Sequence, residues 1–249
     1  MIHYHGTPIT GDTAWRALAG RHAMVSYAHN DQTAVAFELC QSVSLDNGAF
    51  SAWTAGTPFD IDGFGEWLER WYRHPAFDWY LIPDVIDGDH NANAQMRAHW
   101  FSVGGTKLWR HGVPVYHMHE PLEVLRDLAN AFDRVALGSS GEYSIVGSPR
   151  WWHRMAEIMP VVCDDGIPRV KLHGLRMLDP TVFSHLPLSS ADSTNVARNI
   201  GINSAWGGPY APANKLSRAL VLMDRIEAHA SASTWCSTNG QQQNLGLFG

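Results

Sequence analysis

Three aspartates each follow a short apolar run, and these positions suit acid–base or nucleophilic chemistry. Asp46 ends "SVSLD", Asp84 follows "WYLIP", and Asp192 ends "LSSAD". A carboxylate is costly to bury unless it is paired or used. Helix capping would account for one such aspartate, but not for three together with a fourth acid, Glu142. We therefore expect a group of carboxylates that act together as general acid–base or nucleophile.

Other polar residues and glycines stand where the remaining apolar runs end. If these ends meet in space, they form a ring of candidate substrate-binding groups around the aspartates. The candidates are His3, His5, Asn47, Gly48, His117, His119, Gly138, Ser139, Glu142, His173 and Gly174. The glycines would let backbone N–H groups approach a planar ligand closely.

The chain must position these residues with short strands and amphipathic helices. Eight apolar segments have the length of buried strands: 2–5, 23–27, 42–46, 79–83, 114–117, 134–137, 169–173 and 188–192. Helical patterns lie over 63–72, 121–132, 148–159 and 214–230. Pro121 suits a first helical turn, and Ser148 followed by Pro149 is a typical helix start. The helix after Pro180 is expected to be short.

Strand and helix thus alternate eight times, which predicts a parallel sheet in an α/β fold. The count favours a single-domain (β/α)8 TIM barrel over residues 1–230. Residues 231–249 are polar and contain glycine, a composition typical of a flexible tail. Active sites of such barrels lie in the loops that follow the strands, which is where the aspartates fall.

Composition narrows the class of protein further. The 249 residues carry a formal charge of −6 and are 45% hydrophobic, which is normal for a globular chain. No apolar run is long enough to span a membrane, and the first residues do not read as a secretory signal, so we expect a cytoplasmic protein. The three cysteines are far apart, so the sequence indicates neither a disulfide framework nor a zinc ribbon.

The acidic balance argues against a broad phosphate-binding surface, although a local basic stripe remains compatible with it. The chain has eleven tryptophans. Most of them are expected to pack in the core, and a few could stack on bases.

Four motifs resemble those of the guanine transglycosylases, which exchange a base in tRNA. "LDNGAFSAW" resembles their D-S-G-G-F-Q motif, and "RVALGSSGEY" their G-G-L-x-V-G-E loop. "RVKLHGLRMLDP" resembles a strand that ends in an L-M-G-V-G-like turn, and "SADSTNVARN" resembles F-D-C-V-x-P-T-R-x-A-R-N. The motifs come in the family's order over residues 42–199. The likeness is greatest to the phage-type branch, which inserts 7-deazaguanine bases into DNA.

This resemblance implies a role for each matching residue. Asp192 matches the nucleophile, and Asp46 matches the general acid–base. Asp84 stands where the family binds the base, with Asp87 as a rival. The remaining substrate-binding positions it implies are Asn47, Gly48, Phe50, His117, His119, Gly138, Ser139, Glu142, His173 and Gly174. His117 or His119 falls near a strand-end glutamine of the family, so the residue type differs there.

The chemistry of base exchange agrees with these residue types. A carboxylate attacks the sugar and forms a covalent ester, as in retaining glycosidases, while a second carboxyl protonates the leaving base. A third can accept two N–H groups from a guanine-like base and so reject adenine.

The resemblance also implies partners. Arg176, Arg198, Asn199 and Lys171 are the candidate nucleic-acid contacts. We expect DNA, a 7-deazaguanine (preQ0-like) base and partner proteins of a DNA-modification system, with a homodimer as a further possibility and no cofactor or metal. The tRNA enzymes carry a C-x-C-x-x-C zinc motif after the nucleophile, whereas only Cys236 follows Asp192 here. This makes tRNA the less favoured polymer.

Two alternatives stay open. Zinc-dependent amidohydrolases are also barrels, and they use H-x-H after the first strand with later histidines and an aspartate. His3, His5, His173 and Asp192, with His117 or His119, would suit such a site. The other alternative is a non-catalytic barrel that binds nucleic acid or a partner subunit.

Overall fold

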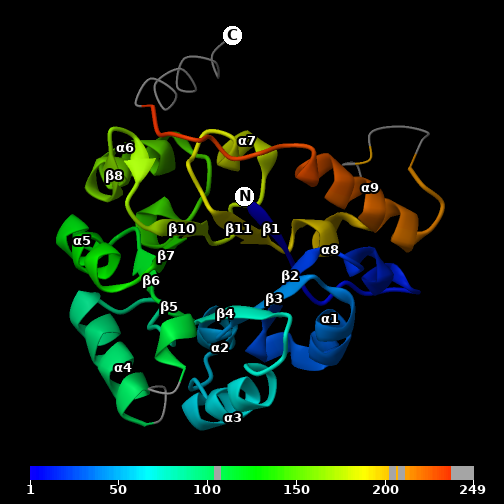
Figure 1. Ribbon diagram of the computed structural model, residues 1–249, viewed down its shortest axis with the longest axis horizontal. Coiled ribbons are helices and arrows are strands. Elements are labelled where there is room, and N and C mark those ends of the chain that lie inside the picture. The colour runs from blue at the N-terminus through cyan, green and yellow to red at the C-terminus, as the bar shows by residue number, and fades with distance from the viewer. Residues whose placement is uncertain (104–107, 202–205, 207–210, 237–249) are drawn as a thin grey trace.

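The computed structural model describes residues 1–103, 108–201, 206 and 211–236, and it has an α/β fold with a nearly closed, barrel-like sheet (Figure 1). The sheet has nine strands, all parallel, in the order β5-β4-β3-β2-β1-β11-β10-β7-β6. They are β1 (Ile2–Gly6), β2 (His22–Ser26), β3 (Ser42–Asp46), β4 (Phe77–Leu81), β5 (Gly112–Val113), β6 (Val115–His117), β7 (Arg134–Gly138), β10 (Lys171–Gly174) and β11 (Ser190–Ser193). The predicted parallel sheet is thus confirmed.

The two ends of the sheet are formed by consecutive pieces of one chain segment. β5 pairs with β4, β6 pairs with β7, and only Pro114 separates the two pieces. Proline has no N–H to donate to a ladder. The Val113 carbonyl accepts from Ile82 N, whereas the Pro114 carbonyl accepts from Ala136 N, each at 2.9 Å. The strand expected over 114–117 corresponds to β6, and Pro114 separates it from an additional strand, β5, which raises the strand number from eight to nine.

Helices surround the sheet (Figure 1). They are α1 (Thr33–Leu39), α2 (Ala49–Ala55), α3 (Ile61–Trp71), α4 (His90–Ser102), α5 (Leu122–Ala131), α6 (Pro149–Val162), α7 (Pro180–Phe183), α8 (Asn195–Asn199) and α9 (Lys215–Glu227). The four predicted helices are α3, α5, α6 and α9, and α7 is short as expected. Ser148 caps α6 by accepting from Trp151 N at 3.3 Å, whereas Pro121 precedes α5 as its N-cap instead of entering its first turn.

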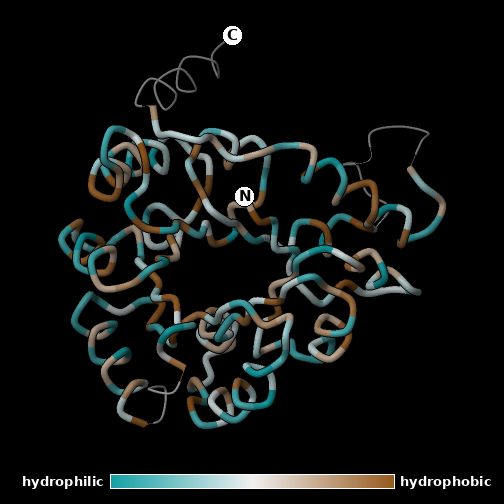
Figure 2. The backbone as a smooth tube through the Cα atoms, viewed as in Figure 1, coloured by the Kyte–Doolittle hydropathy of each residue, from teal (hydrophilic) through white to brown (hydrophobic). Residues whose placement is uncertain are grey.

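Side chains alternate between two apolar layers. The inner layer comprises Tyr4, Met24, Trp79, Leu81, Val113, Val115 and Ala136. The larger outer layer joins the strands to the helices, and it includes Val25, Leu45 and Leu172. Figure 2 shows hydrophobic residues recurring along the strands and on the surrounding helices. Because successive strand residues point to opposite faces, Asp46 and His173 belong to the inner face, next to Leu45 and Leu172 of the outer one.

A polar group lies inside the sheet near the start of β4. The pairing of β3 with β4 shifts between Val43↔Phe77 and Leu45↔Tyr80, so β4 has one extra residue there. The Tyr4 hydroxyl donates to the Asp78 carboxylate and accepts from Trp79 Nε1 at 3.1 Å. The irregularity thus lets two consecutive residues of β4 bind one hydroxyl.

The chain beyond α9 packs back on the domain. The Trp235 N–H donates to the Gly166 carbonyl at 2.8 Å, next to a hairpin of β8 (Cys163–Asp164) and β9 (Ile167–Pro168) that the sequence did not predict. The Trp235 side chain is buried in the outer apolar layer. Packing therefore extends past the predicted boundary at residue 230, and residues 237–249 of the predicted tail lie outside the described part of the chain. Within the described part, no helix has the length and apolar character needed to cross a membrane.

Candidate functional site

Asp46 and Asp192 lie at the carboxyl ends of two parallel strands. In the sheet, β3 and β11 are separated by β2 and β1, and Asp46 is in register with Ser26, while Asp192 is in register with Tyr4. The negative charges of Asp192 and Asp84 both act on the Asp46 carboxyl. The structure thus brings together the three aspartates that sequence analysis singled out.

The Asp46 carboxyl is partly withdrawn from water, and its Oδ1 accepts a hydrogen bond from Gly48 N at 3.3 Å. Burial raises the pKa of Asp46 to about 6, because the charged form loses hydration. Ser26 and the Gly48 N–H lower this pKa, whereas the charges of Asp192 and Asp84 raise it further. Asp46 can therefore hold or release a proton near neutral pH, as a general acid–base must.

Gly48 makes this turn possible. Its φ is +78°, a left-handed conformation that costs residues with a side chain about 1–2 kcal/mol. A Cβ at this position would also lie 2.9 Å from the backbone nitrogen of Ala28. Position 48, directly before α2, therefore favours glycine.

One oxygen of Asp192 is held from two sides. Oδ1 accepts the backbone N–H of Arg176 at 3.0 Å, and it lies 3.3 Å from Nε2 of the fully buried His173. The Arg176 guanidinium donates to the Ser139 carbonyl at 2.7 Å. The loop after β10 thus orients the Asp192 carboxylate and links it to the end of β7.

Asp84 is part of a second polar group. Its Oδ1 accepts from Asn47 Nδ2 at 2.8 Å, and its Oδ2 lies 2.9 Å from Nε2 of His117. Burial lowers the pKa of His117, but the carboxylates of Asp84 and Glu120 outweigh it, so the net shift is upward. Asn47 is itself fixed, because its Nδ2 also donates to the Ile82 carbonyl at 2.9 Å. An acid and an adjacent imidazole thus present both an acceptor and a donor.

Glu120 is a functional candidate that the sequence analysis missed. It is 1% exposed, and its carboxylate accepts from His117 N at 3.0 Å and from Asn93 Nδ2 at 3.2 Å. Arg97 of α4 contributes a positive charge that acts on Glu120 and Asp84. The run "YHMHEP" carried a signal, an acid three residues after a strand end, but nothing local pointed to Asn93 or Arg97.

Two exposed aromatic rings on α2 adjoin this region. Phe50 and Trp53 are 48% and 49% exposed, and their ring centroids are 5.8 Å apart. The Arg176 guanidinium carbon lies 5.1 Å from the centre of the Phe50 ring. Since the Arg176 backbone also binds Asp192, the aromatic pair lies close to one of the catalytic candidates.

Other predicted residues lie in the same loops without contacting the aspartates. His119 is hydrogen-bonded to Ser140 Oγ at 2.8 Å and to the Gly88 carbonyl at 3.1 Å. Ser139 accepts from Trp151 Nε1 at 2.9 Å. Gly138 and Gly174 end β7 and β10. These residues shape the carboxyl edge of the sheet.

Some predicted contacts fall elsewhere. Glu142 is exposed and pairs with Arg150 at 2.9 Å, so it does not join the aspartate group. Lys171 begins β10 in register with Arg134, at the amino edge of the sheet. Lys171 therefore lies at the edge of the sheet opposite to Asp192. Arg198 is exposed on α8, and its charge acts on Arg176, while Asn199 Nδ2 donates to the Asn195 carbonyl at 2.9 Å.

The histidines of the first strand face outward. His5 Nε2 lies 2.8 Å from Glu227 of α9, and His3 Nε2 is hydrogen-bonded to the His229 carbonyl at 3.0 Å. His173 contacts Tyr4 and Trp79 on the inner face instead. The amidohydrolase alternative requires His3, His5 and His173 on one face of the sheet. In the structure the H-x-H pair lies on the opposite face from His173. Among the described residues, no group of three or more His, Cys, Asp or Glu side chains is placed to hold a metal ion.

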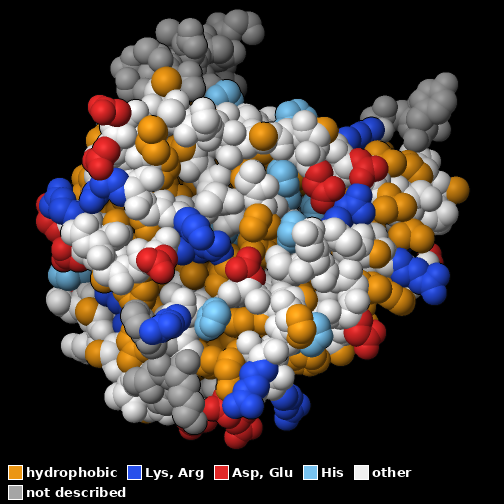
Figure 3. Space-filling model, viewed as in Figure 1, with side chains coloured by type: hydrophobic (Ala, Val, Ile, Leu, Met, Phe, Trp, Pro, Cys, Tyr) orange, Lys and Arg blue, Asp and Glu red, His pale blue; other side chains and the backbone are white. Residues whose placement is uncertain are grey.

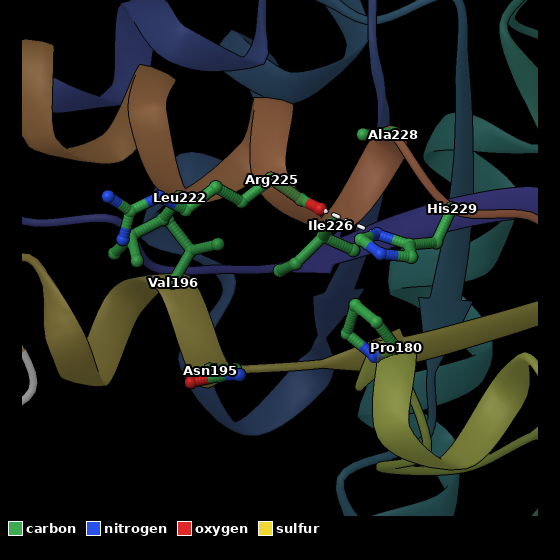
Figure 4. Close-up of a pocket in the computed structure, with 8 residues that line it drawn as sticks. All are labelled: Pro180, Asn195, Val196, Leu222, Arg225, Ile226, Ala228 and His229. Atoms are coloured by element: carbon green, nitrogen blue, oxygen red, sulfur yellow. Dashed lines mark hydrogen bonds between the residues drawn. The ribbon is translucent and has the colours of Figure 1, made fainter.

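Two cavities lie apart from the aspartate group. One, of about 420 Å³, lies between α7, α8 and α9 (Figure 4) and is lined by Pro180, Asn195, Val196, Leu222, Arg225, Ile226, Ala228 and His229. The other, of about 690 Å³, includes Asp133, Lys171 and Ser189 near the amino edge of the sheet. On the face in Figure 3, acidic, basic and histidine side chains are scattered, without one large basic patch.

Comparison with known proteins adds no family to this geometry. No protein family matches the chain, and no curated protein is similar to it in sequence.

The raised pKa of Asp46 predicts a pH-dependent stability difference. The folded protein holds this proton up to about pH 6, whereas the ordinary value is 3.8. Folding therefore favours the protonated form, and this group's contribution to the free energy of unfolding falls as pH rises through that interval. The free energy of unfolding of Asp46→Asn, relative to that of the native chain, should therefore rise by about 3 kcal/mol between pH 3 and pH 7.

Urea unfolding across this pH range measures the difference, with the exposed Asp87→Asn variant as the control for loss of one negative charge. A difference between Asp46→Asn and the native chain that stays constant with pH would contradict the raised pKa.

Proposed function

We propose that this protein is a base-exchange transglycosylase that replaces guanine in DNA with a 7-deazaguanine base through a covalent aspartyl–sugar intermediate. The observation that carries the proposal is the placement of Asp46 and Asp192 at one edge of the sheet in different surroundings. We also propose that the sheet is a (β/α)8 TIM barrel whose fifth strand is interrupted at Pro114.

In this mechanism Asp192 is the nucleophile. Its carboxylate attacks C1′ of the sugar, the bond from C1′ to guanine breaks, and an ester to the enzyme forms. The contacts of Oδ1 with Arg176 and His173 hold the carboxylate in one orientation. Positioning of this kind removes much of the entropic cost of the attack.

Asp46 moves the proton. With a pKa of about 6 it is able to carry a proton near neutral pH and give it to the departing base. The resulting carboxylate then takes a proton from the incoming 7-deazaguanine, whose nitrogen attacks C1′ and displaces Asp192. The ester bond to Asp192 is broken and Asp46 regains its proton, so both carboxyl groups end in the state in which they began.

Asp84 and His117 supply base recognition in the proposal. An ionised Asp84 can accept both N–H groups on one edge of a guanine-like base, and adenine lacks that pattern. His117 lies 2.9 Å from Asp84 and can donate to the neighbouring carbonyl of the base. Asn47 donates to the Asp84 carboxylate, and Glu120 accepts from the backbone N–H of His117, so both residues are held in place.

The polymer contacts in the proposal are few and local. Exposed Phe50 and Trp53 offer rings on which bases can stack, and Arg176 and Arg198 can contact phosphate. The formal charge of −6 makes a wide electrostatic footprint unfavourable. A partner protein that supplies further DNA contacts therefore fits the chain, and tRNA is the alternative polymer.

We expect Asp192→Ala to abolish base exchange while the fold is retained, because the variant has no nucleophile. The assay follows radiolabelled guanine or a 7-deazaguanine into duplex DNA, single-stranded DNA and tRNA. Glu142→Gln, a surface acid paired with Arg150, is the control and should keep exchange activity. Circular dichroism checks the fold of both variants.

The outcomes of this assay distinguish the proposal from its alternatives. Label in DNA that depends on Asp192 supports the proposal, whereas label only in tRNA would make tRNA the substrate in place of DNA. Exchange by Asp192→Ala at the native rate would remove Asp192 from the mechanism. Absence of exchange by the native chain in every polymer, with or without partner proteins of a DNA-modification system, would overturn the proposed function.

Guanine affinity should distinguish Asp84 from Asp87, the two acids compared in the loop after β4. Asp84→Asn should weaken guanine binding by about 1–3 kcal/mol, because an amide cannot accept both N–H groups with charge assistance. Asp87→Asn, an exposed neighbour, should bind like the native chain. Calorimetric titration with guanine measures both affinities, and equal losses in the two variants would contradict the role of Asp84.

A further inference from the structure

His173 is a buried imidazole whose hydrogen bond to Asp192 depends on which of its ring nitrogens carries the proton. It is 0% exposed, at the carboxyl end of β10, in register with Ser190 of β11. Its Nδ1 lies 2.9 Å from Ser190 Oγ, and its Nε2 lies 3.3 Å from Asp192 Oδ1. The ring thus connects a serine and the aspartate two residues further along the same strand.

These two contacts select one form of the ring. A carboxylate can only accept, so a hydrogen bond to Asp192 needs a proton on Nε2. A neutral ring then has a bare Nδ1, which accepts from the Ser190 hydroxyl. Serine is able to supply that proton because its hydroxyl rotates to suit its partner.

The surroundings favour the neutral ring. Burial lowers the pKa of His173, and the positive charge of Arg134 adds to this, whereas Asp192 and Asp78 raise it, with a net shift downward. Tyr4 and Trp79 pack edge-on against the ring, at centroid distances of 6.0 and 4.6 Å. A neutral donor orients Asp192 without neutralising its charge, which preserves the carboxylate as a nucleophile.

We propose that His173 is a positioning residue for Asp192, and that Ser190 holds it in the tautomer with the proton on Nε2. The positioning role rests on the proposed function, because it takes Asp192 as the nucleophile. The tautomer does not, since it follows from the contacts of the folded chain alone.

The tautomer is tested without any substrate. Protein labelled with 15N-histidine gives long-range 1H–15N correlations that distinguish the two neutral tautomers and the charged ring, and His173→Gln assigns the signal. At pH 7 we expect the Nε2–H tautomer in the native chain and a mixture of tautomers in Ser190→Ala. A proton on Nδ1, a charged ring, or an unchanged signal in Ser190→Ala would overturn the proposal.

The positioning role is tested with a matched pair of amides. In His173→Gln the amide nitrogen is as many bonds from Cα as Nε2 and can still reach Asp192, whereas in His173→Asn it is as far as Nδ1 and cannot. We expect kcat for exchange to fall about 100-fold in the asparagine variant, with KM for the nucleic acid unchanged. The glutamine variant should recover most of the rate.

Thermal unfolding of the two amide variants separates positioning from folding. Equal stability with unequal kcat supports the proposal, and equal losses of kcat, or a rise in KM alone, would overturn it. Absence of exchange in the native chain would refute the proposed function, and the tautomer measurement would still decide the arrangement of His173 and Ser190.

Discussion

The site depends on the cost of withdrawing Asp46 from water at the edge of a parallel sheet. In a parallel sheet all strands end at the same edge, so acids at strand ends are brought together whatever their distance in sequence. Asp46, Asp84 and Asp192 meet in this way, and burial together with their mutual repulsion favours a proton on Asp46. Asp46 favours its protonated form, whereas Asp192 is held by hydrogen-bond donors. Such a difference between two carboxyl groups is what a general acid–base and a nucleophile require.

The chain segment on either side of Pro114, which forms both ends of the nearly closed sheet, gives this edge its shape. Because β5 and β6 pair with opposite ends of the sheet, the loops after β4 and β6 become neighbours. Asp84 then lies beside His117, whose backbone N–H donates to Glu120, and Asn93 donates to Glu120 in turn. The polar contacts between Asp192, His173 and Ser190 form the corresponding support on the other side. Each candidate catalytic or base-binding carboxylate is thus held by residues from another loop or strand.

The parallel sheet and the helices α3, α5, α6 and α9 could be predicted from the sequence because apolar periodicity and capping residues are local signals. The strand ends at Asp46 and Asp192 were predictable for the same reason. The division at Pro114 was not, since it depends on which strands lie on either side. The outward direction of His3 and His5, and the position of Lys171 at the amino edge, follow from register, which short strands do not reveal.

The supporting residues were the least predictable. Asn93 and Arg97 act on Glu120 from a helix that carries no motif, and Ser190 gains its role only because β11 pairs with β10. Such contacts arise from tertiary packing, whereas motifs record residues that touch the ligand. The resemblance to the transglycosylases therefore pointed to the carboxylates and left their positioning to the structure.

The central claim is that Asp192 becomes covalently attached to the sugar, and peptide mapping of a trapped adduct tests it most directly. The protein is incubated with guanine-containing DNA without free base, denatured in acid, digested and analysed by mass spectrometry. We predict a sugar adduct on the peptide that contains Asp192, at the Asp192 carboxyl. An adduct on Asp46, or exchange that proceeds with no adduct on either aspartate, would contradict the account.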